Sequence, residues 1–312
     1  MSNNVKTVMG IAAASVKTVN GIAAASVKTV MNEALVLIKD IATVTSYTQA
    51  ASSGNYGVNM SYDEDNDFVY IQYPRNGGGG GAVVGSFNST DQDVDFGSEQ
   101  TIESSNAFSG NSCDYDKYNN RIWSAWIGGG DNTIYARCGT IGSDKSISWG
   151  TTLTIQGGNN SVSNYNQGLI QQGLAVDQST GKCLVVWNNA ADSFGGASSH
   201  HPNGVILTVD TSDNSITKSN AVRMATGGSG ESYPIMLCHY DPDNTEWVAV
   251  TDANGSATSG INALRITNSS GDPAAANFTS LGSNSGHTLQ GSKSVNGGRY
   301  GGLTFIYDES SD

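Results

Sequence analysis

The chain has 312 residues, including 39 glycines and 5 prolines, and 15 Lys plus Arg against 28 Asp plus Glu give a net charge of −13. The length suits one large domain or two smaller ones, and this composition is typical of short strands joined by tight turns. Because no basic residues cluster, the sequence excludes a nucleic-acid binder that works by neutralising phosphates, and we expect no nucleic-acid partner.

The start of the chain lacks the features of a signal peptide. Met1 to Asn4 carry no positive side chain, and no long apolar core follows them. Ala34 to Ile38 is among the longest apolar stretches, and it is far too short to span a bilayer. We therefore expect no insertion into a membrane and no export through a cleaved leader.

An 11-residue phrase recurs three times near the N-terminus, at Val5–Ser15, at Val16–Ser26 and in a third copy that breaks down after Met31. Asn20-Gly21 in the second copy supplies the two positive φ values of a type I′ turn, so the phrase predicts a β-hairpin. The same period also fits a right-handed coiled coil, and a flexible tail is a third alternative. Because a lone hairpin is barely stable, we expect this segment to be ordered by a partner.

The third copy passes into an apolar segment that runs to Val44. Asn32 can cap a short helix there, with Leu35, Ile38 and Ile41 on one face. Residues 1–54 are therefore predicted to form an N-terminal arm that anchors or oligomerises the chain, with a possible short helix.

From about residue 55 to the last residue, a longer unit recurs. It begins with an apolar strand ending in Asp, followed by a polar turn and a second apolar strand. The marker aspartates lie 53, 61, 64 and 67 residues apart, at Asp63, Asp116, Asp177, Asp241 and Asp308. The residue three positions before each of them is apolar, so we predict buried, equivalent side chains at Met60, Cys113, Leu174, Cys238 and Phe305.

Further strands complete each unit. A third strand is predicted at Ala82–Phe87, Ile134–Gly139, Val205–Val209 and Ala263–Ile266, and a fourth at Val94–Gly97 and Ile147–Gly150 of the first two units only. Four short antiparallel strands per unit predict an all-β, propeller-like repeat domain over residues 55–312, with a β-sandwich as the alternative. The fifth unit stops after its first strand, which we interpret as truncation; the alternative is that this strand completes a ring with the first unit.

Two resemblances indicate a source. The N-terminal repeats resemble those near the start of tail and appendage proteins of marine and cyanobacterial bacteriophages. The longer units resemble a phage and marine bacterial repeat with a Tyr-Asp turn and a return strand ending in "ISFG", matched here by Val94–Gly97 and Ile147–Gly150.

These resemblances imply a bacteriophage virion structural protein: a tail fibre, baseplate or capsid appendage. It would be made in the host cytoplasm and located in the virion, with its N-terminal arm bound to other virion proteins. They also imply a homo-oligomer, a trimer as in phage fibres, that contacts a host surface glycan. The alternatives are a glycan-active or glycan-binding propeller, either a hydrolase or an adhesin.

No residue pattern in the sequence defines a catalytic, cofactor or metal site. Asp63 to Asp67 has alternating carboxylates but lacks the central Gly and final Glu of a calcium loop, so a solvated turn is predicted. His200-His201 is interpreted as the tip of a loop over 188–203, and Gly77 to Gly81 as a hairpin tip and not a phosphate loop. We therefore expect no catalytic residues, no metal, no cofactor and no enzymatic activity.

The remaining distinctive residues are predicted to belong to the core. Trp123, Trp187 and Trp247 all lie in the strand after a marker turn, where aromatic side chains pack between blades more often than they stack on sugars. The four cysteines form no CxxC pair and are predicted to be unpaired buried residues: Cys113, Cys138, Cys183 and Cys238.

Overall fold

The computed structural model describes residues 58–75, 78–88, 93–104, 108–128, 133–156, 173–189, 201–224, 235–252, 261–275 and 279–280, with four two-residue strands near the N-terminus. The chain divides into two compact units. One comprises Met1–Ser46 with Phe87–Asp95, and the other comprises Tyr47–Ser86 with Phe96–Asp312. The arm boundary at residue 54 stays a prediction.

The N-terminal repeats form two short hairpins. β1 (Thr7–Val8) pairs antiparallel with β2 (Ile11–Ala12), and β3 (Thr18–Val19) pairs in the same way with β4 (Ile22–Ala23). In each copy two residues separate the paired strands, and in the second copy they are Asn20-Gly21. The hairpin prediction is confirmed, whereas the helix expected after Asn32 lies outside the described residues.

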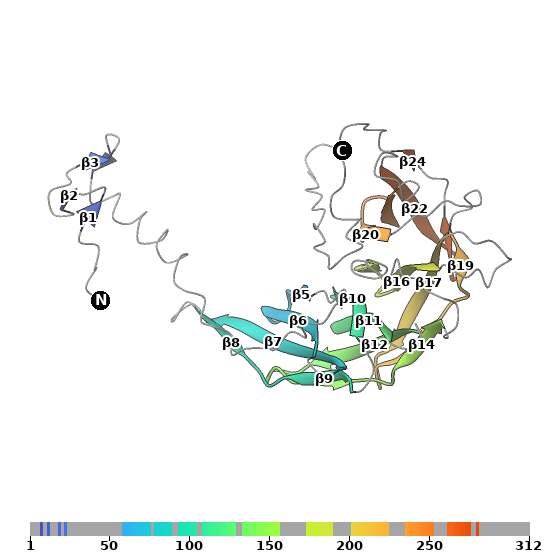
Figure 1. Cartoon of the computed structure of the whole chain (residues 1–312), viewed down its shortest axis with the longest axis horizontal. Helices are drawn as coiled ribbons and strands as arrows, with labels where there is room; N and C mark the ends of the chain where they lie inside the picture. The colour runs from blue at the N-terminus through green and yellow to red at the C-terminus, as the bar shows by residue number, and fades with distance from the viewer. Residues whose placement is uncertain are drawn as a thin grey trace. The chain divides into compact units, whose positions relative to one another are not determined.

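Four antiparallel sheets of five strands follow, and we call them blades 1 to 4 (Figure 1). Blades 1 and 2 consist of β5 (Asn59–Asp63), β6 (Phe68–Pro74), β7 (Gly80–Asn88), β8 (Asp93–Phe96) and β9 (Gln100–Glu103), then β10 (Phe108–Asp116), β11 (Arg121–Gly128), β12 (Ile134–Ile141), β13 (Ile147–Trp149) and β14 (Leu153–Gln156). Blades 3 and 4 consist of β15 (Leu174–Val176), β16 (Cys183–Asn189), β17 (His201–Asp210), β18 (Ser215–Lys218) and β19 (Val222–Arg223), then β20 (Ile235–Asp241), β21 (Glu246–Asp252), β22 (Ile261–Ser269), β23 (Asp272–Ala275) and β24 (Thr279–Ser280).

A fourth strand is present in every blade, although the sequence predicted it in only two. In each blade the third strand pairs with the fourth at one end and with a fifth, short strand at the other. Turn residues explain the fourth strands that the sequence missed. Asn214 has φ 61° before β18, and Ser270 and Gly271 have φ 54° and 100° before β23. Residues with positive φ permit a tight turn between the third and fourth strands. The fourth strand therefore forms even where its sequence lacks the ending seen in the first two units.

The first strands of the blades lie next to one another. β5 contacts β10, β10 contacts β15, and β15 contacts β20, whereas farther out β12 contacts β18 and β17 contacts β23. Sheets that meet along their first strands and stand side by side define a β-propeller. The all-β propeller prediction is confirmed, and the β-sandwich alternative is wrong.

Apolar cores lie between successive blades. Blades 1 and 2 enclose Tyr70, Phe108 and Trp126. Blades 2 and 3 enclose Trp123 and Trp187, and blades 3 and 4 enclose Trp247. Trp123, Trp126, Trp187 and Trp247 are all buried. The prediction that Trp123, Trp187 and Trp247 pack between blades is confirmed.

The predicted equivalence of the marker positions holds in part. Leu174 and Cys238 are 4% and 5% exposed, and Cys113 is half-buried. Met60, however, is 66% exposed, so its predicted burial is wrong. In blades 3 and 4 the side chain at this position packs on the preceding blade. Met60 is exposed because β5 belongs to blade 1, which has no preceding blade among the described residues. Phe305 lies outside the described residues.

The cysteine prediction is confirmed for pairing. All four cysteines are free, and Cys138, Cys183 and Cys238 are buried, whereas Cys113 is half-buried. Burial raises the pKa of the Cys183 thiol well above its ordinary value, which keeps it in the neutral form.

We predict that Leu174→Ala costs about 2–5 kcal/mol, because it removes a buried side chain from the core between blades 2 and 3. Tyr118→Ala is the matched control. Tyr118 is 63% exposed in a turn, so its truncation should change stability by less than about 0.5 kcal/mol. Urea unfolding measures both, and equal costs would show that the blade interface is misassigned.

Candidate functional site

Each of the four described marker aspartates holds its own turn. Asp63 Oδ1 accepts hydrogen bonds from the backbone N–H groups of Asp65 and Asn66, both at 3.1 Å. Asp177 Oδ1 accepts from Ser179 N at 2.8 Å, and the same bond forms in blade 4 at Asp241. These are the turns that the sequence predicted. Within the described part of the chain, no group of three or more His, Cys, Asp or Glu side chains could hold a metal ion.

The tyrosine before a marker aspartate reaches the turn of the preceding blade. Tyr115 Oη donates to Asp65 Oδ2 at 2.8 Å, and Tyr240 hydrogen bonds with Asp177 and Ser179. Burial, together with the bond to Asp65, raises the pKa of Tyr115. These tyrosines link the marker turn of blade 1 to blade 2 and that of blade 3 to blade 4.

The residue two positions before each marker aspartate lies on the first strand of its blade, and the four are Ser61, Asp114, Ala175 and His239. Asp114 is the acidic one, and its side chain is half-buried. Its Oδ2 accepts a hydrogen bond from Val176 N of blade 3 at 2.9 Å, and its Oδ1 accepts from Tyr115 N at 2.9 Å. These two bonds fix the carboxyl group between β10 and β15.

The pKa of Asp114 is unusual for an aspartate. Burial raises it from 3.8 to about 7, even though the bonds from Val176 N, Tyr115 N and Ser61 favour the charged form. The ion pairs Arg75–Glu99, Lys117–Glu64 and Arg265–Glu246 do not include Asp114. Asp114 is therefore a carboxyl group that can hold or release a proton near neutral pH.

A buried amide network lies at the start of the first two inner strands. Asn111 Oδ1 accepts hydrogen bonds from Asn59 Nδ2 and Gln72 Nε2, both at 2.9 Å. Tyr70 Oη donates to Gln72 Oε1 at 3.0 Å, and Gln72 and Asn111 are fully buried. Because buried amides are costly unless they are bonded, this network fixes β5 against β10 and supports the strand that carries Asp114.

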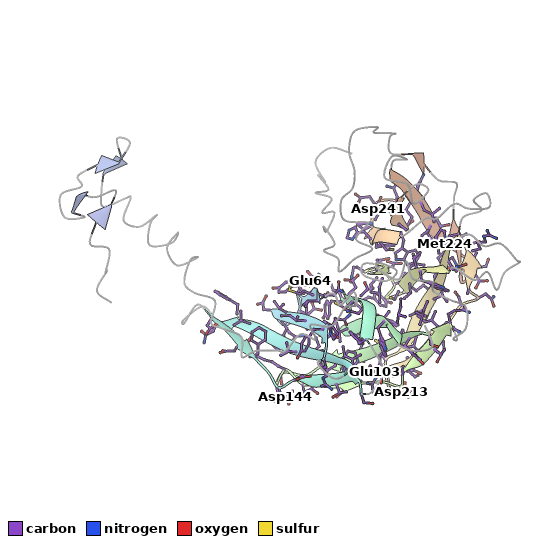
Figure 2. All side chains as sticks on the ribbon, viewed as in Figure 1. Glu64, Glu103, Asp144, Asp213, Met224 and Asp241 are labelled. Carbon is purple, nitrogen blue, oxygen red and sulfur yellow. The ribbon has the colours of Figure 1, made fainter. Side chains whose placement is uncertain are left out.

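Acidic side chains lie both beside the first strands and along the outer strands of the blades. Figure 2 shows Glu64 and Asp241 beside the first strands, whereas Asp144 and Asp213 lie along the outer strands. Asp144 is exposed, and its carboxylate accepts hydrogen bonds from Ser146, which lower its pKa. Asp144 is thus an aspartate of ordinary turn type that lies away from Asp114.

Two loop predictions are corrected. His201 begins β17 and pairs with Asn189, so the loop expected over 188–203 is shorter than predicted because β16 and β17 extend into it. Gly80 and Gly81 belong to β7 and are buried. A Cβ at Gly80 would lie 2.3 Å from the Phe108 ring, so packing between blades requires glycine there. His200 and Gly77 lie outside the described residues.

The sequence did not identify Asp114. A weak signal was available, since residues at alternating positions of a strand share a face and Asp114 lies two positions before Asp116. The repeat pattern pointed only to the carboxylates in the turns. The burial of the inner strand, which gives Asp114 its pKa, depends on β15 and is therefore visible only in the fold.

No family model and no curated protein matches the chain. Among solved structures it is similar to a periplasmic gluconolactonase from Pseudomonas aeruginosa, with 7% identity over 72% of each chain and a TM-score of 0.36. It is similar to an endo-1,4-β-xylanase from Bacteroides thetaiotaomicron, with 13% identity over 72% of this chain and 77% of that chain and a TM-score of 0.39. It is also similar to an α-L-arabinofuranosidase from Clostridium thermocellum, with 12% identity over 75% and 74% and a TM-score of 0.39.

At these identities the similarity concerns the fold alone. It nevertheless corrects the expectation that the protein is not an enzyme, because enzymes are among the solved structures that the chain resembles. That expectation rested on the lack of a catalytic motif in the sequence. Within the described residues, no helix is long and apolar enough to cross a membrane.

We predict that Asp114→Asn changes the pH dependence of stability. A raised pKa in the folded state means that native Asp114 loses stability as the pH rises from about 4 to about 7, since the buried group must ionise. The melting temperature of the Asn variant minus that of the native protein should be more positive at pH 8 than at pH 4. Thermal unfolding at both pH values measures it, and a difference that is independent of pH would contradict the assignment.

Proposed function

We propose that the chain is a carbohydrate-active β-propeller protein that cleaves glycosidic bonds, with Asp114 as its proton donor. The observation that supports this most strongly is the position of Asp114. It is a half-buried carboxyl group on an inner strand, fixed by two backbone N–H groups and outside every ion pair among the described residues.

The chemistry of glycoside cleavage fits such a group. The leaving oxygen must receive a proton, and the acid that supplies it needs a pKa raised by burial so that it remains protonated near neutral pH. Burial does this at Asp114, and its pKa of about 7 lies at the pH where the group can both donate and recover a proton.

The neighbouring inner positions suit a polyhydroxylated ligand. Ser61 hydrogen bonds with Asp114 from the adjacent strand, and His239 is exposed at the equivalent position of blade 4. A hydroxyl and an imidazole beside an acid provide donors and acceptors for sugar hydroxyls. Burial raises the pKa of the Cys238 thiol, and Asp114 adds to this shift.

Release of reducing sugar from bacterial and algal surface polysaccharides tests the proposal. We predict that Asp114→Asn lowers the rate at least about 100-fold, as expected for removal of a general acid, while the amide oxygen keeps one of the two backbone N–H bonds that Asp114 accepts. Asp144→Asn is the matched control and should retain the native rate. Native activity should fall above pH 7. No release by the native protein, or equal rates in both variants, would contradict the proposal.

We also propose that this propeller is part of a bacteriophage particle, as the resemblance of its N-terminal repeats implies. The observation that favours this is the pair of hairpins β1–β2 and β3–β4, which are too small to bury a core and suit an arm bound to another virion protein. The arm would hold a trimer on the particle, and the propeller would contact a host surface glycan.

Deletion of residues 1–31 tests the arm. We predict that the shortened protein keeps the native melting temperature of the propeller but is absent from purified particles. Mass spectrometry of the particles and thermal unfolding of the isolated protein measure the two quantities. Normal incorporation of the shortened protein would contradict the proposed role of the arm.

A further inference from the structure

The strands that surround Asp114 are nearly free of positive side chains. The first strands of the four blades, β5, β10, β15 and β20, contain no lysine and no arginine. The second strands, β6, β11, β16 and β21, contain one, Arg121, where β11 leaves its marker turn. These eight strands form the inner half of the described blades, because the first strands contact one another and each second strand pairs with a first.

Arg121 is already bonded within the protein. Its Nε donates to Asn214 Oδ1 at 2.6 Å and its Nη2 to Thr211 O at 2.7 Å. Its Nη1 donates to Asn119 O and Asn120 O, at 2.9 and 2.8 Å. A guanidinium has five N–H groups, so these bonds use most of them. Because Thr211 and Asn214 lie in the turn between β17 and β18, Arg121 is held at an outer turn of blade 3.

Other positive side chains bond to the outer strands. Arg137 of β12 donates to Gly150 O at 2.8 Å and to Ile102 O at 2.9 Å. Lys218 of β18 donates to Ile155 O at 2.6 Å. These cations join neighbouring blades through third, fourth and fifth strands, and neither of them lies on an inner strand.

The marker turns, which adjoin the inner strands, are acidic. Together with the residue that follows each of them, the four described turns hold nine acidic residues against three basic ones, over 63–68, 116–121, 177–182 and 241–246. Lys117, one of the three, pairs with Glu64 at 2.8 Å, and Lys182 is half-buried. Glu246 pairs with Arg265 of β22 at 2.6 Å. The balance beside the inner strands is therefore negative.

This negative charge lies close to the candidate acid. Asp114 stands two positions before Asp116, a separation of about 7 Å along a strand. Charges at that distance interact, since the screening length is about 10 Å at 0.1 M salt. Burial is the main cause of the raised pKa of Asp114, and the charge of Asp116 adds to it. The turn carboxylates therefore act on a ligand that reaches Asp114.

Uncharged polar groups are available there instead. Ser61 hydrogen bonds with Asp114 from the adjacent strand, and Asn59 and Gln72 donate to Asn111 on the strand that carries the acid. His239 is exposed on β20. Hydroxyl, amide and imidazole groups can exchange hydrogen bonds with hydroxyl groups, which are what an uncharged sugar presents.

We infer that the substrate of this site is an uncharged polysaccharide, without carboxylate, sulfate or phosphate groups. The inference rests on the proposed glycosidase function of Asp114. An anionic sugar is recognised through lysine or arginine, above all through the paired N–H groups of a guanidinium. Here it would meet carboxylates and find no free cation on the described inner strands, and a charge that loses water without gaining a partner is strongly disfavoured.

Matched pairs of polymers test the inference. Reducing sugar is measured from galactan and sulfated galactan, from xylan and glucuronoxylan, and from hydroxyethyl cellulose and carboxymethyl cellulose. The native protein should cleave the uncharged member of a pair at least about 10-fold faster, and added salt should narrow the difference. Faster cleavage of the acidic member overturns the inference and leaves the proposed function standing. No release from any polymer contradicts the proposed function itself, and the inference with it.

Two double variants show whether the preference arises at the inner strands. Glu64→Gln with Asp243→Asn removes two exposed carboxylates from the marker turns and should raise the rate on the acidic polymer, relative to the uncharged one, several-fold. Asp144→Asn with Asp213→Asn removes the same charge from exposed turns of the outer strands and should leave this ratio at its native value (Figure 2). Equal changes in the two double variants would assign the preference to the net charge of the whole chain and overturn the inference.

Discussion

The structure depends on one contact, the packing of each blade's first strand on the preceding blade. In this contact an apolar side chain three positions before the marker aspartate enters the core between blades, as Leu174 does. The next inward-facing side chain, Tyr115 or Tyr240, adds a hydrogen bond to the preceding turn. No blade buries both of its faces alone, so stability is shared between neighbours, as it is in other repeat proteins. The exposure of Met60 follows from the same contact, because blade 1 has no described predecessor.

Much of this fold could be predicted from the sequence, because the spacing of the marker aspartates gives the length of one blade. Asp is also suited to the turn that it forms in each blade. The fourth strands of blades 3 and 4 could not. They depend on Asn214, Ser270 and Gly271 adopting positive φ, which the expected strand ending did not reveal. The burial of the β7 glycines could not be predicted for a related reason. The Phe108 ring leaves no room for a side chain at Gly80, and Phe108 belongs to the first strand of the next blade.

The candidate site was less predictable than the fold. A regular repeat places equivalent backbone positions around one centre, but function needs them to differ, and the four residues two positions before the markers are Ser61, Asp114, Ala175 and His239. The sequence shows this set without showing that β15 covers Asp114 and raises its pKa. A carboxyl group acquires this chemistry from burial, which is a property of neighbouring blades and not of the local sequence.

The contact between blades is tested most directly by a double-mutant cycle between Tyr115→Phe and Asp65→Ala. The hydroxyl and the carboxylate join blades 1 and 2 through a bond of 2.8 Å, and the apolar packing around them remains in both variants. Urea unfolding of the four proteins should give a coupling free energy of about 0.5–1.5 kcal/mol. Costs that add within about 0.3 kcal/mol would show that the tyrosine of one blade does not recognise the turn of the blade before it.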